Sequence, residues 1–258
     1  MDYRTYAYLQ TAQDAGARAM VEALPEVAGR FNPNGPASAA PNSAALFAIA
    51  AIPARYALER GAWSEAAALV PRPTPYPYTE ALTHLARAIG GAHTGNSALV
   101  SASVAALQQI TDTLAKQHEE YWAEQTDIQR RVAASLLAFA EGRQVDAVAA
   151  MRTAAAMEDR TEKSAVTPGP LAPARELLGE LLLQLGQPAA ALPEFEATLK
   201  KEPNRFRAVY GAAKAADLAA NRTKARAYYS QLLKICERGD VPGRPELAEA
   251  RKGAAAGR

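Results

Sequence analysis

A repeated spacing of small and aromatic residues near the C-terminus constrains the fold more than any other feature. The stretch LLGELLLQLGQPAAALPEFEATLKKEPN is followed by VYGAAKAADLAANRTKARAYYSQLLKIC, and the loop residues Gly186 and Ala220 lie 34 positions apart. Small residues flank each loop and an aromatic residue follows: Gly179, Ala191 and Phe195 in the first stretch, and Ala213, Ala225 and Tyr229 in the second. Small residues let two antiparallel helices cross closely, and the aromatic ring fills the remaining gap.

This period and pattern resemble the tetratricopeptide repeat (TPR), which implies pairs of antiparallel helices stacked in a right-handed α-solenoid. The whole chain is also similar to the C-terminal part of a family of uncharacterised bacterial TPR proteins. The shared phrases are IPARYALERGAW, YWAEQTDIQR and VTPGPLAPARELLGELL. This resemblance implies no reaction. It also implies an N-terminally longer protein in which Met1 begins inside the solenoid.

Weaker matches to the same offsets surround four more loops. They are Asp14 with Ala7 and Ala19, Gly61 with Ala54 and Ala66, Gly95 with Ala88 and Val100, and Gly142 with Ser135 and Ala147. We therefore expect one all-α domain over 1–258, a solenoid of about six TPR-like helix pairs and no strands. The pairs are expected near 2–28, 42–70, 78–116, 117–158, 172–201 and 204–238, with a flexible tail at 252–258.

Unequal steps between the loops predict insertions. The segments 29–43 and 161–173 are rich in helix-breaking residues, and 70–78 (VPRPTPYPY) favours an extended path along which Tyr76 and Tyr78 dock back on the helices. The stretch 97–141 has no proline, which predicts long helices, and the helix that begins at Tyr121 and Trp122 is expected in the middle of the stack. A short helix is expected from Pro245 to Arg251.

Composition restricts the partners and the compartment. The chain has 29 basic and 27 acidic residues, a balance that disfavours nucleic acid as a partner. No secretory signal and no run of 18 apolar residues is present, so we expect no membrane association and a cytoplasmic location. The single cysteine, Cys236, excludes an intramolecular disulfide and is expected to be buried.

Motifs for chemistry are sparse, and no cofactor is expected. Nucleophile elbows, phosphate loops, cysteine pairs and the HExxH zinc motif are all missing. His84, His118 and Glu119 are the weak candidates for a metal site, with a solvated or hydrogen-bonded histidine as the more ordinary interpretation.

Polar residues on the first helices of the pairs predict a ligand-binding groove, because in TPR folds these helices line the concave surface. The residues are Arg55, Glu59, Glu176, Glu180, Gln184, Arg207, Tyr210, Lys214 and Asp217. The alternative is a solvated face with ion pairs such as Glu180 to Lys214.

The leading functional hypothesis is a scaffold that binds a peptide segment or partner protein in this groove. The main alternative is a hydrolase or metal-dependent enzyme whose site lies where the long central helices meet the 70–78 loop and uses His84, His118 or the nearby glutamates. A self-association module is a third alternative. Whether the chain is an enzyme stays open at this point.

Overall fold

The protein is all-α, as the sequence predicts. The computed structural model describes residues 1–32, 35 and 41–255; it is 75% helical, and no strand occurs within these ranges. The helices are α1 (Asp2–Gln10), α2 (Asp14–Arg30), α3 (Asn42–Glu59), α4 (Trp63–Ala67), α5 (Pro77–His93), α6 (Ser97–Lys116), α7 (Glu120–Ala140), α8 (Gln144–Asp159), α9 (Ala174–Gln184), α10 (Pro188–Lys201), α11 (Phe206–Leu218), α12 (Arg222–Ile235) and α13 (Pro245–Ala255).

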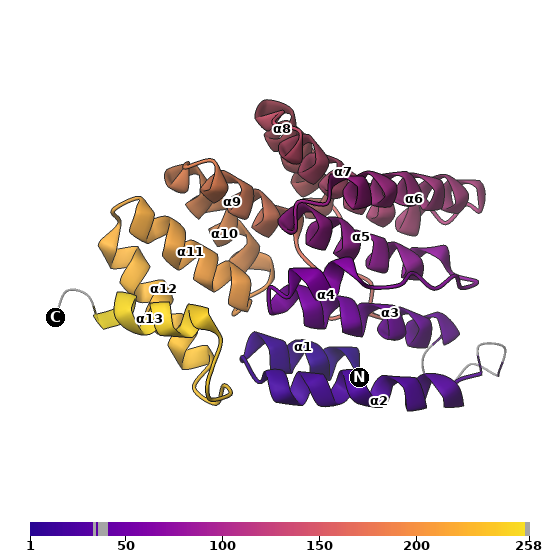
Figure 1. The fold of residues 1–258 in the computed structure, drawn as a ribbon, viewed down its shortest axis with the longest axis horizontal. Coiled ribbons are helices and arrows are strands. Elements are labelled where there is room, and N and C mark those ends of the chain that lie inside the picture. The colour runs from indigo at the N-terminus through magenta and orange to yellow at the C-terminus, as the bar shows by residue number, and fades with distance from the viewer. Residues whose placement is uncertain (33–34, 36–40, 256–258) are drawn as a thin grey trace.

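Helices that follow each other along the chain pack against each other, and the array curves from α1 and α2 through α7 and α8 to α13 (Figure 1). The odd-numbered helices also form a row, in which α1 packs on α3, α3 on α5, and α5 on α7. The row is interrupted after α7, because α9 packs against α8 and α11 and does not form such a contact with α7. The segment 160–173, here called the α8–α9 connection, joins α8 to α9.

Left-handed backbone conformations mark the turns within the helix pairs. Gly61, Gly95, Gly142, Gly186 and Ala220 have positive φ angles, so five of the six predicted loop residues lie at the turns themselves. This conformation ends a helix and costs least at glycine. The flanking small residues of these five loops are buried as predicted.

The first pair requires a correction of two residues. Its turn has the positive φ at Ala12, whereas Asp14 already begins α2. The residues at the predicted offsets from Ala12 are Thr5 and Ala17, which are both fully buried, while the predicted Ala7 and Ala19 are exposed. The match around Asp14 therefore predicts the wrong register for α1 and α2.

Phe195 shows why small residues recur at the helix crossings. Its ring lies between α9 and α11, such that a Cβ atom added to Gly179 would lie 2.7 Å from Cζ and one added to Gly211 would lie 2.3 Å from Cε1. No side chain fits at either glycine without movement of the ring. The aromatic residue therefore packs against the next helix pair, as the sequence predicts.

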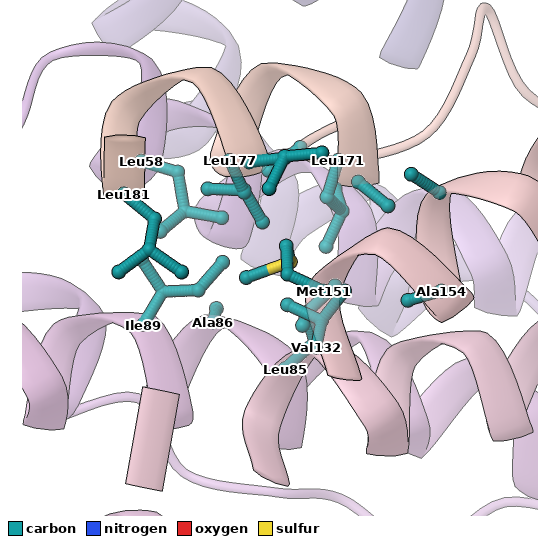
Figure 2. Packing of buried hydrophobic residues seen from close by; sticks show 14 of the residues in the cluster. Leu58, Leu85, Ala86, Ile89, Val132, Met151, Ala154, Leu171, Leu177 and Leu181 are labelled. Carbon is teal, nitrogen blue, oxygen red and sulfur yellow. The ribbon is translucent and has the colours of Figure 1, made fainter. Parts of the chain in front are cut away.

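The largest part of the hydrophobic core runs along the middle of the array. Figure 2 shows Leu171 and Leu177 on one side, Leu85 and Val132 on the other, and Met151 between them. Because Leu171 belongs to the α8–α9 connection, this connection is itself packed into the core.

The first helix pair closes back on the C-terminal part of the chain. The Gln10 side-chain oxygen accepts a hydrogen bond from Phe206 N at 2.7 Å, and Arg244 donates to Asp14 at 2.6 Å and to the Leu9 carbonyl at 3.0 Å. These contacts join residues about 200 positions apart in the sequence, which the repeat pattern does not predict.

The predicted insertions and ends are partly altered. Much of the 29–43 insertion lies outside the described residues, and α2 extends to Arg30. Tyr78 does dock, as part of α5, and 97–140 forms the long helices α6 and α7. The last helix reaches Ala255, beyond the predicted end at Arg251, and 256–258 lie outside the described residues. Cys236 is buried, and no helix in the described ranges is long and apolar enough to cross a membrane.

Candidate functional site

A cavity of about 310 Å³ lies between the helices α3, α5 and α7 and the α8–α9 connection. One wall comes from α3, α5 and α7, and the other from the end of α8, the α8–α9 connection, the start of α9 and the end of α10. The cavity thus lies where the row of odd-numbered helices is interrupted, between α7 and α9. We call it the inner cavity.

Aromatic rings form one part of its wall. Tyr78 of α5 stacks on Trp122 of α7 with ring centroids 3.8 Å apart and planes 5° from parallel. Phe47 of α3 approaches the same indole at 5.9 Å, and Tyr121 meets it edge-on at 4.9 Å. This cluster fixes the first turn of α7, and Tyr121 stays 36% exposed at the wall.

Three polar residues of α7 line the cavity next to these rings. Gln125, Thr126 and Gln129 lie within about one helical turn, and each has a buried side-chain atom without a hydrogen-bond partner: Nε2, Oγ1 and Oε1, respectively. Thr126 is fully buried. Such groups ordinarily find a partner, and leaving one unpaired costs about 1–3 kcal/mol.

Charged residues form the opposite wall. Arg175 Nε donates to Asp159 at 2.7 Å and its Nη1 to Glu194 at 2.5 Å, while Lys201 Nζ donates to the Asp159 carbonyl at 2.7 Å. These two cations are therefore already engaged by acceptors of the chain itself.

Glu158 differs from its neighbours. It accepts a hydrogen bond from Ala174 N, the first N–H of α9, at 2.7 Å, and no cationic side chain in the described ranges forms an ion pair with it. Burial raises the pKa of Glu158 to about 7, with smaller increases from Glu202 and Asp159, while the Ala174 N–H and Lys201 act in the opposite direction. This carboxyl can change its charge near neutral pH.

Hydrogen bonds to its backbone carbonyls hold the α8–α9 connection against α1, α3 and α7. Buried Arg55 donates to the Pro170 carbonyl at 3.0 Å and the Gly169 carbonyl at 3.1 Å, and pairs with Asp2 at 3.1 Å. Tyr3 donates to the Thr167 carbonyl at 2.9 Å and Tyr121 to the Glu162 carbonyl at 2.9 Å. Residues of α1, α3 and α7 thus bind an irregular segment, which contains turns and bends, through its main chain.

Three of the nine predicted groove residues lie inside the protein. Arg55, Glu59 and Glu176 are at most 1% exposed. Glu176 accepts two hydrogen bonds from buried Arg205, at 2.7 and 2.9 Å, and Glu59 lies 2.9 Å from the same guanidinium. At these three positions, ion pairs within the chain are buried where the sequence predicts an open groove.

The pairing expected for Glu180 and Lys214 is wrong. Glu180 accepts from Arg207 at 2.6 Å, and the Arg207 guanidinium also lies over the Trp63 ring at 5.1 Å. Lys214 and Tyr210 instead donate to Glu249 of α13, at 2.7 and 2.6 Å. Helix α13 therefore lies over this face of α11.

Gln184 and Asp217 are exposed, so two of the nine predicted groove residues remain open to solvent. That these nine residues bind a ligand stays a prediction.

The candidate metal ligands do not converge. His84 lies 3.5 Å from Glu80, one turn away on α5, and burial lowers its pKa, partly offset by Glu80. His118 has a positive φ of 58° in the turn before α7 and is exposed, like Glu119. In the part of the chain that the structure describes, no group of three or more His, Cys, Asp or Glu side chains could hold a metal ion.

Tyr78, Tyr121 and Trp122 stand out in the sequence as residues that dock on a helix or begin one, but the predicted site residues do not include the polar residues of the inner cavity. The signal for Gln125, Thr126 and Gln129 was polar residues at spacings of one and four on a helix expected to be contacted on several sides. Glu158 gave no signal, because its partner Ala174 lies beyond the connection. Comparison of the chain with protein-family models and with curated proteins gives no match in either case.

Proposed function

We propose that this protein is a non-enzymatic, TPR-like scaffold that binds a segment of a partner protein in the inner cavity. The proposal treats α1–α12 as six helix pairs of a right-handed superhelix and the odd-numbered helices as its concave side. What supports this arrangement is the recurrence of the turns and buried small residues along the chain.

The observation that carries the proposal is the set of unpartnered polar atoms on α7. A fully buried hydroxyl at Thr126, between two glutamines that also lack partners, destabilises the unliganded protein. A ligand that supplies hydrogen bonds to these groups recovers that free energy on binding. Sites of this kind combine an apolar wall with a few placed polar groups, as here beside Tyr78 and Trp122.

A polypeptide segment fits the surroundings better than an isolated small molecule. Residues beside the cavity already bind one non-helical segment, the α8–α9 connection, because Arg55, Tyr3 and Tyr121 donate hydrogen bonds to its carbonyls. The remaining volume of about 310 Å³ is at the lower end for a ligand pocket and accommodates one or two side chains. One anchoring side chain of a longer peptide matches that size.

Selection from a library of displayed random peptides tests the proposal. We expect binding peptides whose affinity falls by up to about tenfold when Gln129 is changed to alanine, because a hydrogen bond to a neutral amide contributes about 0.5–1.5 kcal/mol. The matched control is Gln184→Ala, since Gln184 is exposed and belongs to the first predicted groove. Loss of affinity in the control alone would place the site in that groove instead.

A second candidate function is acid–base catalysis, and Glu158 is the observation that favours it. A half-buried carboxyl with a pKa of about 7, beside a cavity and next to Asp159, is suited to proton transfer at neutral pH. This retains the alternative of a hydrolase between the central helices. Turnover of chromogenic esters or glycosides that is lost in Glu158→Gln would favour it over the scaffold.

A further inference from the structure

The inner cavity has an unbalanced set of charges. Its basic residues are engaged: Arg175 by Asp159 and Glu194, Lys201 by Asp159, and Lys163 by the Pro168 carbonyl at 2.9 Å. Its acidic residues do not all form ion pairs. Glu158 has only the Ala174 N–H as a hydrogen-bond donor.

Glu202, on the same wall, is also poorly neutralised. It accepts a hydrogen bond from Tyr6 at 3.1 Å, and the nearest cationic nitrogen, Arg205 Nη1, is 3.9 Å away. That guanidinium is already shared by Glu59 and Glu176 at 2.9 and 2.7 Å. Arg205 is therefore shared among three carboxylates. Arg207 also acts on Glu59 and Glu176, but it forms no ion pair with Glu202. Of the three carboxylates, Glu202 has the most distant cation and lines the cavity.

The rest of the wall suits an organic cation. The side-chain oxygens of Thr126 and Gln129 are able to accept hydrogen bonds, and both are buried without a hydrogen-bond partner. Tyr121 and Trp122 offer aromatic rings, which attract ammonium and guanidinium groups. Thr126, at 0% exposure, is an unpartnered buried polar side chain in this wall, which is an observation independent of the carboxylates.

We propose that the group bound in the inner cavity is a basic side chain, lysine or arginine, of the partner segment. Its N–H groups donate to Glu158, Gln129 and Thr126, and its aliphatic stem lies along Trp122. The inference rests on the proposed function, since it names the anchoring side chain of the peptide.

Binding of such a group is linked to protons. The charges acting on Glu158 are Glu202 and Asp159, which favour its protonated form, and Lys201, which favours the carboxylate; Arg175 lines the same cavity. A bound cation acts in the same direction as Lys201 and lowers the pKa of Glu158 from about 7. Affinity for the cation consequently rises with pH through neutrality, by up to about tenfold per pH unit below that pKa, because one proton is released.

Capped tripeptides that differ only in the central residue provide the test. The set is acetyl-Ala-X-Ala-amide with X as lysine, arginine, norleucine, glutamine or glutamate. Trp122 fluorescence reports on the cavity in a Trp63→Phe protein, because the chain has 2 tryptophans. Titrations at about pH 6 and pH 8 cover the ionisation of Glu158.

We expect the lysine or arginine peptide to bind at least tenfold more tightly than the norleucine and glutamine peptides at the higher pH. Glu158→Gln should remove this preference and its pH dependence, while the amide oxygen still accepts from Ala174 N. Circular dichroism checks its helicity. In a variant that loses helicity, Gln129→Ala replaces it, with the same expected loss of preference.

The remaining outcomes separate the two proposals. Equal binding of neutral and basic peptides, or tighter binding of the glutamate peptide, overturns the basic anchor and leaves the cavity as a peptide site. No saturable change for any peptide, together with selected peptides that ignore Gln129, overturns both.

Discussion

Replacing Thr126 with valine tests whether the inner cavity lacks partners for its polar groups in the unliganded protein. Valine has nearly the same shape but no hydroxyl. Thr126 is fully buried on α7 and its Oγ1 has no hydrogen-bond partner. Removing an unpaired buried hydroxyl recovers part of its desolvation cost of about 1–3 kcal/mol.

We expect Thr126→Val to raise the free energy of unfolding by about 1 kcal/mol. For a chain of this size that corresponds to a rise in Tm of about 2–4 °C. Urea denaturation followed by circular dichroism measures the free energy, and differential scanning calorimetry measures Tm. The same variant should bind a selected peptide less tightly, since the ligand loses one hydrogen bond.

Ser135→Ala is the matched control on the same helix. Ser135 is also fully buried, but its hydroxyl donates to the Ala147 carbonyl at 2.7 Å. Its removal should lower the free energy of unfolding by about 0.5–1.5 kcal/mol. If Thr126→Val also destabilises the protein to this extent, the Thr126 hydroxyl has a partner in solution, such as a bound water, and the reasoning about the cavity is refuted.

Three further changes test other parts of the structure. Gly179→Leu should destabilise by at least about 1–3 kcal/mol, because its side chain meets the ring of Phe195, and an unchanged Tm would contradict this packing. Arg55→Met removes the partner of buried Asp2 and the donor to the Pro170 carbonyl; we expect a loss of about 3–5 kcal/mol and faster proteolysis within the α8–α9 connection, and unchanged cleavage would contradict the role of Arg55 in holding that segment. Burial raises the pKa of Glu158 from 4.5 to about 7 in the folded protein, so the folded state binds more protons between these values and stability falls as pH rises across them. The contribution of Glu158 to this loss should be at most about 3 kcal/mol and should be absent in Glu158→Gln, whereas the contribution of Glu176, whose pKa burial also raises to about 7, remains in both proteins. Parallel pH profiles of the two proteins would contradict this.

Local features of this fold follow from the sequence because they depend on neighbouring residues. A residue with positive φ at each turn and small residues seven before and five after it identify the helix crossings at five turns. The first turn was misplaced by two residues, since it has Ala12 where most of the others have glycine, and Ala7 and Ala19 gave a false match. In that part of the chain alanine is too frequent for a small-residue pattern to fix the register.

Contacts between distant segments could not be predicted in the same way. The closure of α1 onto Phe206 and Arg244, and the path of the α8–α9 connection under Arg55, join parts of the chain that share no repeat. These contacts bury residues expected in an open groove, such as Glu176. The inner cavity lies between α7 and the α8–α9 connection. Its location therefore depends on the contacts that hold this connection.

A crystal structure of the protein with a peptide selected from the library tests the central claim most directly. The account predicts the peptide in the inner cavity, with a lysine or arginine side chain within hydrogen-bond distance of Glu158 and Gln129 and its stem against Trp122. A peptide bound instead beside Gln184 and Asp217, with the inner cavity holding only water, would contradict it.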